Sequence, residues 1–268
     1  MKVGVQLWGV LKDRKEGTLE ALRELKQLGF NIIEPCIALE PVPGLEHVIW
    51  PREWFNAHAG EITETGLEII SCHIFADDVA RQAHELVAFA EESGIRQFVV
   101  KSPRTLSEDT IGKAGSGYCV AADALASVGV KLLLHNEAED IIARINSKTA
   151  YEYLLDICDG KVGAQVDVGW VYAAGESPEM LLARNAARVK SMHFKDFAGK
   201  AGAYTEVVPG TGNVNTLACI AFAIQHDCPQ IFDMDSFPNG IATDLSIKDN
   251  SIWSDLLCQA GSTDQSYN

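Results

Sequence analysis

Stretches of strand length and stretches with helical spacing alternate along the whole chain. Eight apolar runs have the length of strands, at residues 3–7, 31–33, 67–72, 97–100, 130–134, 162–166, 189–192 and 230–232. A segment with helical spacing follows each of them, at residues 18–28, 52–64, 79–92, 117–128, 149–158, 178–187, 214–225 and 244–258. This alternation requires a parallel sheet with crossover helices, and eight units are the number found in a closed (β/α)8 TIM barrel.

The competing architecture is an open, doubly wound sheet. The turn after the first apolar run reads Trp8-Gly9-Val10-Leu11-Lys12, without the Gly-x-Gly-x-x-Gly pattern that holds a dinucleotide pyrophosphate in such sheets. The barrel is therefore favoured. No composition break marks a second domain, so we expect one domain over residues 1–258 and a loose polar tail at 259–268.

The charge of the chain restricts its partners. The formal net charge is −15, from 22 Lys plus Arg against 37 Asp plus Glu, which would repel both nucleic acid and an anionic membrane surface. The first apolar run is too short for a signal peptide, and no stretch approaches the roughly 20 apolar residues of a membrane span. We expect a cytoplasmic protein that acts on a small molecule.

Polar side chains follow every one of the eight apolar runs, at the barrel end where catalytic groups lie. Any one of them could be a solvated loop residue or a salt-bridge partner, but chance explains all eight poorly. In strand order they are Gln6 and Trp8, Glu34, His73, Lys101, His135 and Glu137, Asp167, His193 and Lys195, and Asp233 and Asp235. The last four strands offer carboxylates and imidazoles without thiolates, a donor set that suits Mn²⁺, Mg²⁺, Co²⁺ or Zn²⁺ with open positions for substrate.

Three motifs in the second half of the chain carry a family resemblance. Leu134-His135-Asn136 and Asp167-Val168-Gly169-Trp170 close the fifth and sixth runs, and Ser191-Met192-His193-Phe194-Lys195-Asp196 closes the seventh. The glycine-rich loop Pro209-Gly210-Thr211-Gly212-Asn213-Val214-Asn215 follows. In this order they resemble the sugar phosphate isomerase/epimerase group of the xylose-isomerase-like TIM barrels, over essentially the whole chain.

The resemblance implies a bound metal ion. In that group one divalent cation, often manganese, is held by side chains from strands five to eight, usually Glu, Asp, His and Glu. The implied ligands here are Asp167, His193 and Asp233, the last being one methylene shorter than the usual Glu. On strand five a subgroup reads His-Asn-His where this chain reads His-Asn-Glu, so the ligand is His135 or Glu137. A carboxylate balances the charge of the cation, which favours Glu137.

The resemblance further implies a metal-dependent isomerase or epimerase that acts on a keto sugar or related polyol through an enediolate. Glu137 and Asp233 are the expected acid and base. The expected substrate-binding residues are Glu34, His73, Lys101, Lys195, Trp8 and Trp170, although core packing is an equally good explanation for the two tryptophans. Dehydration of an inosose-type substrate and a non-catalytic metal- or sugar-binding role are the alternatives.

Two further alternatives concern partners. AP endonucleases share the barrel, but this chain has too few strand-end histidines for a multi-metal cluster and carries the wrong charge for DNA. Barrels of the group often pair, so a homodimer is one option for the oligomeric state.

Overall fold

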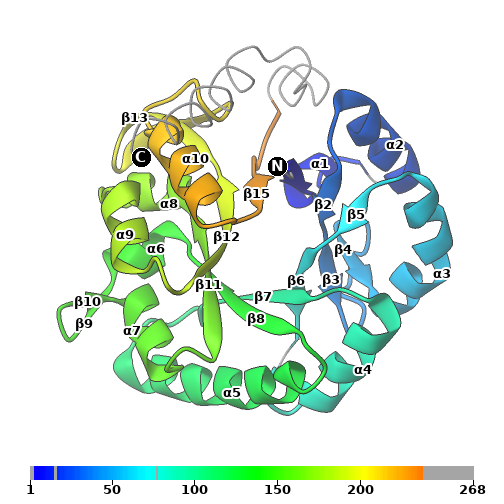
Figure 1. The fold of residues 1–268 in the computed structure, drawn as a ribbon, viewed down its shortest axis with the longest axis horizontal. Coiled ribbons are helices and arrows are strands. Elements are labelled where there is room, and N and C mark those ends of the chain that lie inside the picture. Colours follow the sequence, from blue (N-terminus) through cyan, green and yellow to red (C-terminus); the bar gives the residue numbers. More distant parts are fainter. Residues whose placement is uncertain (1–2, 15–16, 77, 238–268) are drawn as a thin grey trace.

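The strands of the computed structural model form a curled parallel sheet with helices around it (Figure 1). The structure describes residues 3–14, 17–76 and 78–237. Eleven strands are hydrogen-bonded in the order β4-β3-β6-β7-β8-β11-β12-β15-β1-β2-β5. Their bounds are β1 (Val3–Gln6), β2 (Ile32–Glu34), β3 (Cys36–Ala38), β4 (Ile49–Pro51), β5 (Glu68–Ile69), β6 (Ser71–Phe75), β7 (Gln97–Lys101), β8 (Lys131–His135), β11 (Val162–Asp167), β12 (Val189–Phe194) and β15 (Gln230–Phe232).

The sheet closes on itself through two neighbouring barrel strands that are each split in half. Pro35 has no N–H to donate, and it separates β2 from β3, while Ile70 separates β5 from β6. The first halves pair with each other, β2 with β5, and the second halves pair with each other, β3 with β6. The chain therefore supplies eight barrel strands in the described residues, and the predicted barrel is confirmed. The additional short strand β4 lies beside β3.

The helices lie outside the ring of strands (Figure 1). Two coincide with the predicted ranges, α2 (Thr18–Leu28) and α3 (Arg52–Glu64). Four are somewhat shorter than predicted: α4 (Ala83–Ser93), α7 (Ala150–Ile157), α9 (Pro178–Arg184) and α10 (Thr216–Gln225). The helix predicted at 244–258 and the tail predicted at 259–268 fall outside the described residues.

Helix α5 (Glu108–Ala126) begins nine residues before the predicted start at 117. Its beginning is set by Ser107, whose side chain caps the helix in a reciprocal capping box with Thr110. Glycines obscured the helical pattern, and one of them has a packing role. A Cβ on Gly115 would lie 2.6 Å from Cγ2 of Ile157, so the glycine lets α5 approach α7 closely.

Short elements at the carboxyl ends of the barrel strands were not predicted. They are the helices α1 (Trp8–Leu11), α6 (Ala138–Ile142) and α8 (Val168–Ala173), the hairpin of β13 (Asp196–Lys200) with β14 (Ala203–Val207), and the small pair β9 (Arg144–Ile145) and β10 (Lys148–Thr149). Most of them surround the mouth of the barrel, where they position the polar side chains described below. None of the described helices is long and apolar enough to cross a membrane.

Candidate active site

Four buried side chains converge at the carboxyl ends of the last four barrel strands. His135, Asp167, His193 and Asp233 each offer one ligand atom, and these atoms all lie within 4.8 Å of one another. The convergence follows from the register, because Asp167 and His193 are direct partners on the neighbouring parallel strands β11 and β12. Two imidazoles and two carboxylates at such distances can bind a divalent cation.

One oxygen of the cluster lacks a partner. Oδ1 of Asp167 accepts a hydrogen bond from the backbone N–H of Trp170 at 2.9 Å and thereby caps α8. Oδ2 is buried and has no hydrogen-bond partner in the described part of the chain. Burial accordingly raises the pKa of Asp167 well above its ordinary value, against the attraction of Lys195. A buried carboxylate oxygen in this position fits a metal ion, which would supply the missing positive charge.

On strand β8 the cluster contains His135 and not Glu137. Nδ1 of His135 lies 3.0 Å from Oε1 of Gln165, so Nδ1 carries the proton and Nε2 keeps its lone pair for a metal. Burial, reinforced by His193, lowers the pKa of His135 well below its ordinary value and keeps the ring neutral. Glu137 instead forms an ion pair with Lys101, and the two are partly exposed to solvent.

His193 lies between two carboxylates. Its Nε2 is 2.6 Å from Oε1 of Glu34, and its Nδ1 is 3.2 Å from Oδ2 of Asp233. Burial alone would lower the pKa of His193, but the two acids raise it to about 10. Protonated His193 supplies the positive charge between these two acids, and a bound metal ion would supply that charge in its place.

Lys195 is almost completely buried beside Asp233. Its Nζ lies 3.1 Å from Oε1 of Glu206, 3.2 Å from Oδ2 of Asp235 and 3.6 Å from Oδ2 of Asp233, and it lies 5.2 Å from the centre of the Trp170 ring. Burial would raise the pKa of Asp233, yet Lys195 and His193 hold it well below its ordinary value. Asp233 is therefore an ionised carboxylate.

A cavity of about 300 Å³ opens next to the cluster. Several of the predicted site residues line it, namely Trp8, His73, Lys101, His135, Glu137, Trp170 and Asp233. Glu34 and Lys195, which we expected to bind substrate, are not among its lining residues and are bonded to protein groups instead. Their positions suit residues that hold the cluster in place.

The sequence matches the model of the xylose isomerase-like TIM barrel family over residues 22–248. The chain belongs to this family. No curated protein gives a significant match.

Solved structures with this family's fold include sugar-processing proteins of low sequence identity. A sugar phosphate isomerase/epimerase from Parabacteroides distasonis superimposes with a TM-score of 0.72 and 18% identity, covering 96% of this chain and 98% of its own. D-psicose 3-epimerase from Clostridium cellulolyticum, solved with D-tagatose, gives 0.65 and 12%, covering 99% and 98%. A xylose isomerase-like TIM barrel protein from Mycobacterium smegmatis, solved in complex with magnesium, gives 0.69 and 15%, covering 97% of each chain.

Three residues outside the predicted site set also contact the site. Gln165 lies two positions before Asp167 on β11. Residues two apart in a strand lie on the same face, so this spacing places Gln165 on the side of the strand that carries Asp167. Asn136 joins β8 to β11, because its Oδ1 accepts from the backbone N–H of Asp167 at 3.0 Å and its Nδ2 donates to the Asp167 carbonyl at 3.2 Å. Glu206 reaches the site from β14, where its Oε1 accepts a hydrogen bond from Nζ of Lys195 at 3.1 Å.

Proposed function

We propose that this protein is a divalent-metal-dependent sugar isomerase or epimerase that acts on a keto sugar or a related polyol. The unpartnered Oδ2 of Asp167, within 4.8 Å of three other potential ligand atoms, is the observation that carries the proposal. Relatives of the same fold that are named as sugar isomerases or epimerases support it.

The ligands of the ion would be His135, Asp167, His193 and Asp233. Their oxygen and nitrogen donors suit a divalent cation, for which the resemblance favours Mn²⁺ with Mg²⁺, Co²⁺ and Zn²⁺ as alternatives. A bound dication would act as a Lewis acid that polarises the substrate carbonyl and stabilises the negative charge of an enediolate.

Glu137 and Asp233 are suited to move the proton. Both carboxylates line the cavity, Glu137 following β8 and Asp233 following β15. Glu137 is ion-paired with Lys101, and its carboxylate would accept a proton from the carbon next to the carbonyl. Return of that proton to the neighbouring carbon completes an isomerisation, and its return to the opposite face of the same carbon completes an epimerisation.

The remaining cavity residues would bind the sugar. Nε2 of His73 lies 3.0 Å from Oε1 of Gln165 and 3.2 Å from Oε1 of Glu34, which fixes the ring at the cavity wall. Trp8 and Trp170 also line the cavity and would contact the apolar face of a sugar. Glu34 and Lys195 would orient His193 and Asp233 from beneath.

The test is proton exchange with solvent. The manganese-loaded protein is incubated in D₂O with keto sugars and inososes, and deuterium at the carbon next to the carbonyl is measured by NMR. We expect incorporation by the wild type and its loss in Glu137→Gln. Glu139→Gln is the matched control, because Glu139 is an exposed residue of α6, the helix that Glu137 precedes, and does not line the cavity.

The products in the same NMR spectra identify the reaction. A new ketose or aldose indicates isomerisation or epimerisation, whereas loss of a hydroxyl indicates dehydration. Complete absence of exchange across the panel would contradict the proposal and would favour a binding protein without turnover.

A further inference from the structure

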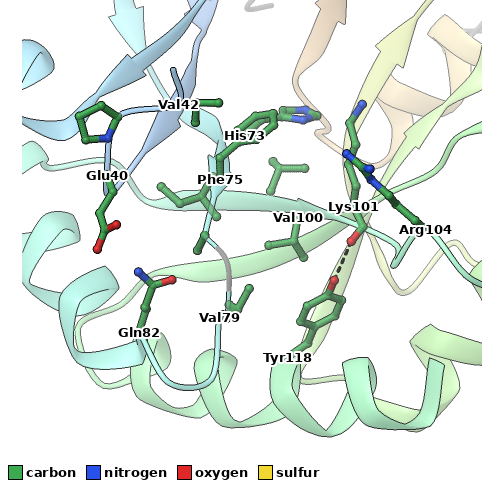
Figure 2. A pocket seen from close by; sticks show the side chains of 14 residues that line it. Glu40, Val42, His73, Phe75, Val79, Gln82, Val100, Lys101, Arg104 and Tyr118 are labelled. Atoms are coloured by element: carbon green, nitrogen blue, oxygen red, sulfur yellow. Dashed lines mark hydrogen bonds between the residues drawn. The ribbon is translucent and has the colours of Figure 1, made fainter. Parts of the chain in front are cut away.

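The mouth of the barrel has a second lobe beside the cavity described above. This outer lobe has a volume of about 440 Å³, and it shares His73, Phe75 and Lys101 with the inner cavity of about 300 Å³. Figure 2 shows the side chains of the outer lobe. Because pockets for small ligands typically measure ~300–1,000 Å³, the inner cavity alone is at the small end of that range. A substrate that extends past these three shared residues would occupy both lobes.

The two lobes differ in charge. The charged residues of the inner cavity are Glu137, Asp233, Asp235 and Lys101, so it is acidic and suits a bound dication. The outer lobe has Lys101 and Arg104 against a single acid, Glu40. The lining of the outer lobe is therefore basic, although the chain as a whole has a net charge of −15.

Arg104 is the cation that remains available. Lys101 is paired with Glu137, whereas no described residue forms a hydrogen bond or ion pair with the guanidinium of Arg104. Figure 2 shows Arg104 beside Lys101 at one end of the lobe, while Glu40 and Gln82 lie at the other end. The cation is therefore spatially separated from the acid that could neutralise it.

The outer lobe also has apolar lining residues and a fixed strand end. Val79, Val99 and Val100 line the lobe and would contact a carbon chain. The hydroxyl of Tyr118 donates a hydrogen bond to the carbonyl of Lys101 at 2.6 Å, which anchors the end of β7 three residues before Arg104.

We propose that the outer lobe binds an anionic group, a carboxylate or a phosphate, at the end of the substrate that is remote from the reacting carbonyl. Arg104 is its counter-ion and Lys101, shared with Glu137, is a second donor. This inference rests on the proposed function, and it defines the substrate class as acidic keto sugars or acidic polyols.

Binding of unreactive polyols tests the inference separately from catalysis. Glucitol, glucitol 6-phosphate and gluconate have no ketone to enolise, and their dissociation constants for the manganese-loaded protein are measured by calorimetry. We expect one or both anions to bind about tenfold more tightly than glucitol, which corresponds to one charge-assisted hydrogen bond. The two anions distinguish a phosphate site from a carboxylate site.

Variants of Arg104 identify the group responsible. Arg104→Gln should bring the ratio of anion to glucitol affinity close to one, Arg104→Lys should keep part of it, and Arg104→Glu should invert it. Arg96→Gln is the matched control, because Arg96 is exposed and lies just before β7, at the opposite end of the same strand. Its affinity ratio should equal that of the wild type.

Two outcomes overturn the inference. One is equal affinity for the anions and glucitol, and the other is an anion preference that survives in Arg104→Gln, as direct binding of gluconate to the metal would give. An Arg104-dependent preference without deuterium exchange on any ketose would support the outer lobe and overturn the proposed catalysis alone.

Discussion

His135 and Gln165 are register partners on the neighbouring strands β8 and β11, and Nδ1 of the imidazole lies 3.0 Å from Oε1 of the amide. The same oxygen lies 3.0 Å from Nε2 of His73, and the amide nitrogen donates to Glu34 at 2.8 Å. One buried glutamine thus fixes the orientation of a candidate metal ligand and of two of its neighbours. Partners of this kind orient ligands and set their tautomers.

Replacement of Gln165 by Leu should weaken metal binding. Without Oε1, the proton of His135 is free to move to Nε2, the nitrogen that faces the metal. We expect the dissociation constant for Mn²⁺ to rise about 10- to 100-fold, the usual effect of losing such a partner. Calorimetric titration measures it.

Ser191→Ala is the control, since Ser191 contacts Gln165 only at 3.4 Å. The affinity of this variant for Mn²⁺ should stay within a few-fold of the wild type. Equal affinities in wild type and Gln165→Leu would refute this role.

Replacement of Gly9 by Ala should disturb the segment that directly follows β15, the last barrel strand. The added Cβ would lie 1.8 Å from the backbone oxygen of Met234, directly after Asp233. The backbone of one segment must move, which we expect to lower the free energy of unfolding by about 2–3 kcal/mol and to weaken Mn²⁺ binding.

Gly60→Ala is the control for that substitution. Gly60 lies in α3 with no atom within 4 Å of an added Cβ, so the variant should gain up to about 1 kcal/mol of stability through its helix propensity. Chemical denaturation measures both changes. If Gly9→Ala has the same free energy of unfolding as the wild type, the backbone at Met234 can move aside without loss of stability, and the prediction is wrong.

Asp140 should make stability depend on pH. Burial raises the pKa of its carboxyl to about 6, against the hydrogen bond that Oδ2 accepts from the backbone N–H of Glu137 at 2.9 Å. Because the folded protein prefers the protonated form, this contribution is fully present below the unfolded pKa of ~3.9 and is lost as pH rises through about 6.

The variant Asp140→Asn keeps an oxygen for the Glu137 amide but does not titrate. Relative to this variant, the wild type should lose about 2–3 kcal/mol of unfolding free energy between pH 4 and 7. Urea denaturation at a series of pH values gives the difference, and parallel stability curves for the two proteins would contradict the assignment.

The barrel could be predicted because each strand and helix has a local signal. Apolar runs such as 162–166 and glycine stops such as Gly29 are visible in the sequence alone. The start of α5 was missed because glycines, among them Gly115 at the contact with α7, weaken the helical pattern. The hairpin β13–β14 was missed because its residues are mostly polar or small and carry no alternating pattern.

The site was predictable at strand ends and not beyond them. Asp167, His193 and Asp233 follow apolar runs, so their convergence follows from the parallel sheet. The sequence does not decide between His135 and Glu137 as the ligand from the fifth barrel strand, β8. His135 ends β8 and turns into the barrel, whereas Glu137 caps α6 and reaches Lys101. Contacts such as those of Glu206 with the backbone N–H groups of Asp235 and Ser236 arise from tertiary folding alone.

Calorimetric titration of Mn²⁺ into wild type, Asp167→Asn, His135→Ala and Glu137→Gln tests the central claim most directly. Our account predicts one site per chain in the wild type and in Glu137→Gln, and no measurable site in Asp167→Asn or His135→Ala. Asp167→Asn keeps an oxygen to cap α8, so a loss of binding there reflects the ligand and not the fold. Wild-type protein that binds no divalent metal, or Glu137→Gln that loses the site while His135→Ala keeps it, would contradict the account.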